Sequence, residues 1–294
     1  MLMIYLVSVS IIWSFSFGFI KYGLDGMDPF VVGFIRLFLA FLFFLPAFKP
    51  SPGAFKAAPR LLVIGGIQFG LMYMFYLLSY QFLQAHEIAI FTVLTPLYVA
   101  LLDAVIEKRW ITRYLLSALG ACFGALMIRG FPANPEGFVR GFMLVQCSNI
   151  CFAAGQLLYR RVAARFELGR DHSAFCICYA GAVLVAGFFM LLLGPKSIQP
   201  PTSGEWLILL YLGLIPSGIG FFLWNLGARR VNAGVLSAMN NLKVPLAAAV
   251  SCLFFGESLK SLSFWPGACL ILISLWVSRD MLLGGSINRN SKKI

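Results

Sequence analysis

Two similar apolar segments, one in each half of the chain, limit the folds that this sequence can adopt. The later segment runs from Ala233 to Leu246 and reads AGVLSAMNNLKVPL, and the earlier one runs from Ala85 to Leu97 and reads AHEIAIFTVLTPL. Each carries a proline well inside a predicted helix, Pro96 in the first and Pro245 in the second. Because proline has no N–H to donate and crowds the preceding turn, we expect a helix break at both positions.

The composition around these segments excludes most classes of soluble protein. Of 294 residues, 60% are hydrophobic and 12% are charged, and the mean hydropathy is +0.88. Soluble domains are closer to about 45–50% apolar and about 25% charged. The chain has too little polar surface for a soluble enzyme, a disordered chain or a secreted disulfide scaffold. The sequence therefore predicts an all-α protein embedded in a lipid bilayer.

Ten apolar blocks are spaced along the chain, most of them near the roughly 20 residues that a helix needs to cross about 30 Å of hydrocarbon. They lie approximately at residues 2–20, 29–48, 61–83, 88–105, 114–128, 141–158, 173–193, 206–228, 231–255 and 264–281. An even number of spans puts both termini on the same side of the membrane. The first block lacks the cleavage pattern of a signal peptide and is expected to be retained.

The positive charges indicate which side that is. With both termini inside, the cytoplasmic segments carry 16 Lys and Arg residues and the outer segments carry 5. This bias predicts a multi-pass protein of a bacterial inner membrane with cytoplasmic termini. The net charge of +12 is spread over short loops, so a nucleic-acid partner is not expected. All seven Cys lie inside apolar blocks and are expected to pack, without a metal or another cofactor. The sequence makes no prediction of oligomeric state.

The similarity between the two segments extends to the halves that contain them. Each half holds five predicted helices, and because five is odd the second copy must be inverted in the membrane. We predict one repeat over residues 1–130, an inverted repeat over residues 131–281 and a basic cytoplasmic tail over residues 282–294. Inverted repeats with matched helix breaks are typical of carriers whose site lies near the midplane.

At this point the chain resembles a known family, the drug/metabolite transporter superfamily and its ten-helix EamA-type members. The resemblance covers about residues 5–280, and its motif residues are Arg36, Tyr76, Ala85, Thr95, Pro96, Leu97 and Glu107 in the first half and Trp224, Ala233, Val244, Pro245, Leu246 and Glu257 in the second. It implies two inverted five-helix repeats and transport of small metabolites by alternating access. Lys243 departs from the family, whose members usually have a neutral residue there.

Lys243 is the most informative position of the second segment. It lies about 18 Å from the cytoplasmic end of its predicted helix, near the bilayer centre. A cation there costs at least about 2.5–3.5 kcal/mol, so it must face a wet cavity or a partner. Asn240 shares its face, and carbonyls near Asn241 are expected to be freed by Pro245. One interpretation is a site for a substrate carboxylate; the alternative is a gating ion pair with Asp103.

Arg36 is a second intramembrane cation. It lies about 10 Å below the predicted outer surface. It could line a cavity, but we favour the interpretation that its side chain reaches the outer interface or pairs with Asp28.

Polar and aromatic side chains on four predicted helices complete the candidate substrate site. Gln146, Asn149 and Gln156 form one polar stripe, which either lines a cavity or joins helices. The remaining candidates are Trp13, Phe17, Tyr76, Trp224 and Asn225.

These residues together predict a secondary transporter of a zwitterionic, amino-acid-like metabolite. The resemblance adds one candidate, S-adenosylmethionine exchanged for S-adenosylhomocysteine, because such ten-helix carriers include transporters of this kind. Exchange is favoured over proton coupling because the carboxylates cluster at helix ends. The alternatives are an exporter of amines, drugs or other amino acids and, in another class, an intramembrane enzyme or a structural membrane protein. An enzyme is not expected, because the two His residues lie at loop ends and no nucleophile–base pair is recognisable.

Overall fold

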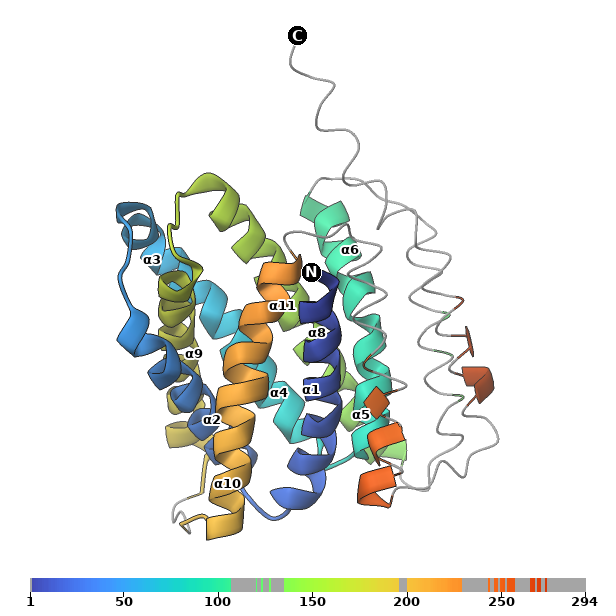
Figure 1. The fold of residues 1–294 in the computed structure, drawn as a ribbon. Helices are drawn as coiled ribbons and strands as arrows, with labels where there is room; N and C mark the ends of the chain where they lie inside the picture. The colour runs from blue at the N-terminus through green and yellow to red at the C-terminus, as the bar shows by residue number, and fades with distance from the viewer. Residues whose placement is uncertain are drawn as a thin grey trace.

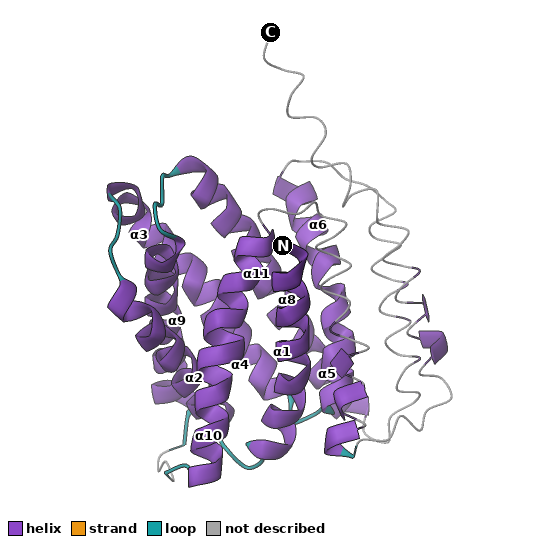
Figure 2. Cartoon of the chain, in the orientation of Figure 1, coloured by secondary structure: helices purple, strands orange, loops and turns teal. Residues whose placement is uncertain are grey.

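The computed structural model is a bundle of helices that run roughly along one axis (Figure 1). It describes residues 2–106, 135–195 and 200–228, with scattered residues between 120 and 127 and between 243 and 273. Within these residues every regular element is helical (Figure 2). The elements in chain order are α1 (Leu2–Gly23), α2 (Pro29–Phe44), η1 (Leu45–Ala47), α3 (Pro52–Gly65), η2 (Gly66–Leu71), α4 (Met72–Ser79), α5 (Ala85–Phe91), η3 (Thr92–Leu94), α6 (Thr95–Ile106), α8 (Pro135–Arg165), α9 (Asp171–Leu193), α10 (Ser203–Leu212), η4 (Gly213–Gly220) and α11 (Phe221–Ala228).

Six helical stretches in the described part of the chain are long and apolar enough to cross a membrane. They correspond to the first, second, third, sixth, seventh and eighth predicted blocks, and the fourth block corresponds to the shorter stretch α5–η3–α6. The predicted all-helical class is confirmed for these residues. The predicted blocks at 114–128, 231–255 and 264–281 lie largely outside the described residues, so the count of ten helices and the inverted repeat stay predictions.

The predicted start of the third block falls well inside the observed helix. The third stretch begins at Pro52 instead of residue 61, after Ser51, whose hydroxyl accepts the Ala54 N–H at 3.0 Å. Its first turns carry the exposed charges Lys56 and Arg60. Hydropathy marks the thickness of the hydrocarbon, whereas a helix continues until its capping residues end it.

Glycines allow α9 to pack closely against α3 and η2. An ideal Cβ on Gly65 would lie 1.8 Å from the carbonyl oxygen of Cys178, and one on Gly181 would lie 2.0 Å from that of Leu62. The two backbones therefore touch directly, as small residues permit in membrane helices. Elsewhere in the bundle, α8 packs against α4 and α6, and η4 packs against α2.

Three of the helical stretches change their hydrogen-bond pattern midway. The stretches α3–η2–α4 and α10–η4–α11 each contain a π-helical segment, and α5–η3–α6 contains a 3-10 turn. Such irregular turns leave or redirect backbone carbonyls and often accompany functional sites. Residues of α4, η3 and η4 meet at the central cavity described next.

Candidate substrate-binding site

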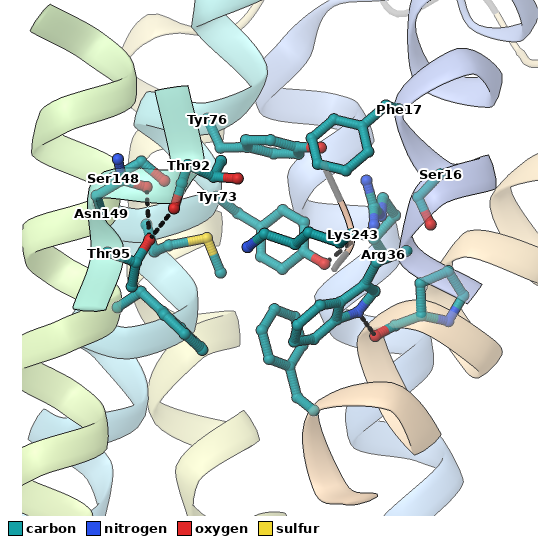
Figure 3. Close-up of a pocket in the computed structure, with 15 residues that line it drawn as sticks. Ser16, Phe17, Arg36, Tyr73, Tyr76, Thr92, Thr95, Ser148, Asn149 and Lys243 are labelled. Carbon is teal, nitrogen blue, oxygen red and sulfur yellow. Dashed lines mark hydrogen bonds between the residues drawn. The ribbon is translucent and has the colours of Figure 1, made fainter. Parts of the chain in front are cut away.

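A central cavity of about 80 Å³ lies between these irregular helices (Figure 3). Its volume in this conformation is below the range of about 300–1,000 Å³ that is usual for small-molecule sites. It is lined by Trp13, Ser16, Phe17, Arg36, Met72, Tyr73, Tyr76, Thr92, Thr95, Ser148, Asn149, Phe152, Pro216, Phe221 and Lys243. These described lining residues include two basic side chains and no Asp or Glu.

Arg36 is almost completely buried in this lining, at 1% exposed. Its Nη2 donates to the Tyr73 hydroxyl at 3.0 Å, and its Nε and Nη2 donate to Ser217 Oγ at 3.3 and 3.2 Å. The guanidinium carbon lies 4.6 Å from the centroid of the Tyr73 ring. The third nitrogen, Nη1, is buried and has no hydrogen-bond partner. The guanidinium is thus held by neutral groups and keeps donor capacity for a ligand.

A proline in η4 explains why Ser217 accepts from Arg36. Pro216 has no N–H, so the Leu212 carbonyl four residues earlier lacks its usual helical donor. The Ser217 hydroxyl donates to that carbonyl at 2.7 Å, which leaves its lone pairs for the guanidinium. The carbonyl of Pro216 itself accepts from Trp13 Nε1 at 3.1 Å. One irregular turn therefore orients both Arg36 and Trp13.

The structure corrects the interpretation favoured for Arg36. Asp28 does not contact it: its Oδ1 accepts the N–H groups of Phe30 and Val31 at 2.9 and 3.1 Å and caps the start of α2. Arg36 lies about two turns further into the helix and turns inward to Tyr73 and Ser217. The expected pairing with Asp28 or exposure at the outer interface is wrong, because inward neutral partners were available at its depth.

The break at Pro96 organises the other side of the cavity. Because Pro96 lacks an N–H, the Thr95 N–H bonds to the Thr92 carbonyl in the 3-10 turn η3. The Phe91 carbonyl, which Thr95 would otherwise have reached, accepts instead from Asn149 Nδ2 at 2.9 Å. The predicted break at Pro96 thus occurs, and it ties α5–η3–α6 to α8.

Lys243 also lines the cavity and is 6% exposed. Its Nζ lies 5.6 Å from the centroid of the Trp13 ring, and Figure 3 shows its side chain extending into the cavity among Tyr73, Tyr76 and Thr92. Asn240, Asn241 and Pro245 lie outside the described residues, and so does the side chain of Asp103. The carboxylate site and the gating ion pair therefore both remain as interpretations of Lys243.

The structure brings some of the predicted site residues together and leaves others outside the lining. Trp13, Phe17, Tyr76 and Asn149 line the cavity. Gln146 lies behind Asn149, with its Oε1 accepting from Asn149 Nδ2 at 3.1 Å. The polar stripe on α8 accordingly both lines the cavity and joins helices.

Two predicted residues on α11 are outside the lining. Trp224 packs behind Trp13, with ring centroids 5.0 Å apart, and the Asn225 amide donates to the Phe221 carbonyl of its own helix at 2.9 Å. Phe221, one turn earlier, lines the cavity instead. Other lining residues that the site prediction did not include are Ser16, Met72, Tyr73, Thr92, Thr95, Ser148, Phe152 and Pro216. Small hydroxyl and apolar side chains are common throughout hydrophobic helices, so their residue type alone does not indicate that they line a binding site.

Several known proteins are similar to this chain over most of its length. The profile of the EamA-like transporter family matches residues 1–130 and 139–279. The biotin transporter of Escherichia coli is 39% identical over 276 residues, which cover 93% of this chain and 92% of that protein. The biotin transporter of Salmonella typhimurium is 40% identical over the same shares. A crystal structure that is 18% identical shares the fold with a TM-score of 0.63, covering 95% of this chain and 98% of that one. The chain belongs to the EamA-like transporter family and is a multi-pass membrane transporter of a small molecule, not an enzyme.

Proposed function

We propose that this protein carries biotin across the bacterial inner membrane by alternating access, with the central cavity as its binding site. Two relatives of about 40% identity over nearly the full chain are biotin transporters. Biotin is a small monoanion with an apolar pentanoate chain and a neutral bicyclic ring. A cavity lined by several aromatic side chains and two basic ones is chemically suited to such a molecule.

The observation that carries this proposal is the buried guanidinium of Arg36. Arginine stays protonated in proteins, so its charge is permanent. Burying a charge without an opposite charge is costly, and the described lining residues include no carboxylate. A substrate carboxylate would supply the missing charge and a partner for the unbonded Nη1.

The same charge balance favours biotin over S-adenosylmethionine. S-adenosylmethionine carries an ammonium and a sulfonium besides its carboxylate, and both cations would enter a cavity lined by Arg36 and Lys243. Like charges at close range in a low-dielectric site repel strongly. Amine-type drugs are disfavoured for the same reason. We therefore propose a monoanionic substrate in place of the zwitterion expected from the sequence.

Uptake of labelled biotin tests the proposal. Cells without their own biotin uptake should accumulate the label when they express this chain, and unlabelled biotin should compete where S-adenosylmethionine and phenylalanine do not. Biotin uptake no higher than in cells carrying an empty vector, at matched protein abundance, would overturn it. Preloading vesicles with biotin should accelerate entry of the label if exchange is the mode of transport. We favour exchange because the described lining lacks Asp, Glu and His as proton carriers.

Both termini are proposed to be cytoplasmic, and the two halves are proposed to be inverted repeats. The excess of Lys and Arg on one side supports the orientation. The two family matches, and a π-helical segment in the third and eighth predicted spans, support the repeat. Reporter fusions after Arg60, Arg170 and the C-terminus should read cytoplasmic, and fusions near Pro135 and Pro200 should read external. An external C-terminus would require an odd number of spans and contradict the repeat.

A further inference from the structure

Arg36 and a group of small polar side chains lie on two separate sides of the cavity, and the Lys243 side chain extends between them. Arg36 occupies one side, and Thr92, Thr95, Ser148 and Asn149 gather on the other, as Figure 3 shows. The second group comes from the turn at Pro96 and the facing part of α8. A substrate bound to Arg36 by its carboxylate would therefore present its far end to this second group.

Nearly all the donor protons of the second group are used within the protein. Thr92 Oγ1 donates to the Ala89 carbonyl at 2.7 Å, and Thr95 Oγ1 donates to the Thr92 carbonyl at 2.7 Å. A hydroxyl has one proton but two lone pairs. Both threonines therefore present acceptor oxygens to the cavity, while the Ser148 hydroxyl can rotate to either role.

The amide of Asn149 likewise uses its N–H groups within the protein. Its two N–H bonds go to the Phe91 carbonyl at 2.9 Å and to Gln146 Oε1 at 3.1 Å. The Gln146 oxygen also accepts from the Tyr98 hydroxyl at 3.2 Å. Because a backbone carbonyl can only accept, the orientation of the amide is fixed. Asn149 Oδ1 accepts from Thr95 Oγ1 at 3.1 Å, so the single Thr95 proton is shared between this oxygen and the Thr92 carbonyl. Because an amide oxygen has two lone pairs, Asn149 Oδ1 keeps one of them for a ligand.

We infer that Thr92, Thr95 and Asn149 form an acceptor face that binds neutral N–H donors at the end of the substrate opposite its carboxylate. The inference rests on the proposed function and narrows its substrate class to monoanions with a ring that carries N–H groups. The cyclic urea of biotin supplies two such donors. A buried acceptor left without a donor loses the solvation it would have in water, so a ring without N–H binds poorly.

Competition between ring analogues tests the acceptor face. Desthiobiotin keeps the carboxylate and both urea N–H groups but lacks the sulfur ring, whereas lipoate keeps the pentanoate and has a sulfur ring without any N–H. Against labelled biotin, desthiobiotin should compete nearly as well as biotin. Lipoate should be roughly tenfold weaker or more, since each unmet buried acceptor costs about 1–3 kcal/mol.

Substitutions in the acceptor face should reduce the difference in affinity between biotin and lipoate. Thr95→Val and Asn149→Leu remove acceptor oxygens and should weaken biotin more than lipoate, whereas Thr95→Ser should retain the preference. The matched control is Ser14→Ala, which removes a buried hydroxyl of α1 that donates to the Ile11 carbonyl and does not line the cavity. It should leave the ratio unchanged.

The possible failures are distinguishable. Absence of any biotin uptake by the unmodified protein overturns the proposed function and this inference together. Biotin uptake that lipoate inhibits as strongly as biotin does overturns the acceptor face alone. Equal losses of biotin and lipoate in Thr95→Val and Asn149→Leu would also overturn it, because they would mean that these side chains act only on the structure of the helix break.

Discussion

Replacing Arg36 by methionine is expected to lower the apparent affinity for biotin roughly ten- to hundredfold. A hydrogen bond between charged groups contributes about 1.5–3 kcal/mol, and each 1.4 kcal/mol corresponds to about a factor of ten in affinity. Methionine keeps much of the length of the side chain but neither charge nor donors. Concentration-dependent uptake, normalised to the amount of protein in the membrane, measures the loss.

Biotinamide separates contact with the carboxylate from a general effect on the cavity. This neutral analogue should compete weakly in the unmodified protein and should lose little further in Arg36→Met. The matched control is Arg60→Met, because Arg60 also lies over an aromatic ring, that of Phe166 at 5.2 Å, but is exposed on α3. If Arg36→Met weakens the binding of biotin and biotinamide equally, Arg36 does not bind the substrate carboxylate.

The stability of the same variant bears on why the arginine is present. In the unliganded protein the guanidinium is buried among neutral groups, and replacing a buried charge by an apolar side chain of similar size is often neutral or stabilising. We therefore expect Arg36→Met to be at least as stable to heat in detergent as the unmodified protein. If Arg36→Met loses transport but not stability, the buried charge is present for transport and does not stabilise the fold.

The helix that carries a residue could be predicted from the sequence more reliably than the direction of its side chain. The sequence places Arg36 in the correct helix, but its inward partners depend on Ser217, which is far away in the chain. That partner exists because Pro216 frees a carbonyl that the serine hydroxyl then satisfies. No local pattern around Arg36 contains this information.

Periodicity succeeded where several polar residues shared one face. Gln146 and Asn149 are three residues apart, so they lie on one side of α8, and the structure joins them by a hydrogen bond. Trp224 and Asn225 are adjacent and therefore point in different directions, and neither reaches the cavity lining. The threonines at the Pro96 break were missed as site residues because their role follows from which backbone carbonyls lose their donors.

Lys243→Met is the second substitution with a large expected effect, a loss of roughly tenfold or more in apparent affinity for biotin. Lys243 lines the same cavity as Arg36, with its Nζ 5.6 Å from the Trp13 ring centroid. An ammonium that contacts the substrate carboxylate contributes about 1.5–3 kcal/mol. Lys243→Arg should recover part of the loss, because it keeps the charge on a longer, planar group. Lys56→Met, at an exposed lysine of α3, is the control and should transport normally.

The two interpretations of Lys243 differ in their dependence on the substrate and on Arg36. A gating ion pair would impair biotin and biotinamide alike, whereas a carboxylate contact would impair mainly biotin. If Arg36 and Lys243 bind the same carboxylate, the loss of binding free energy in the double variant should be smaller than the sum of the losses in the two single variants. The expected difference is about 0.5–3 kcal/mol. Once either cation is removed, the carboxylate is no longer held beside the other. If the losses in binding free energy of the two single variants add within about 0.5 kcal/mol, the two side chains act independently. The gating ion pair would then be the better interpretation of Lys243.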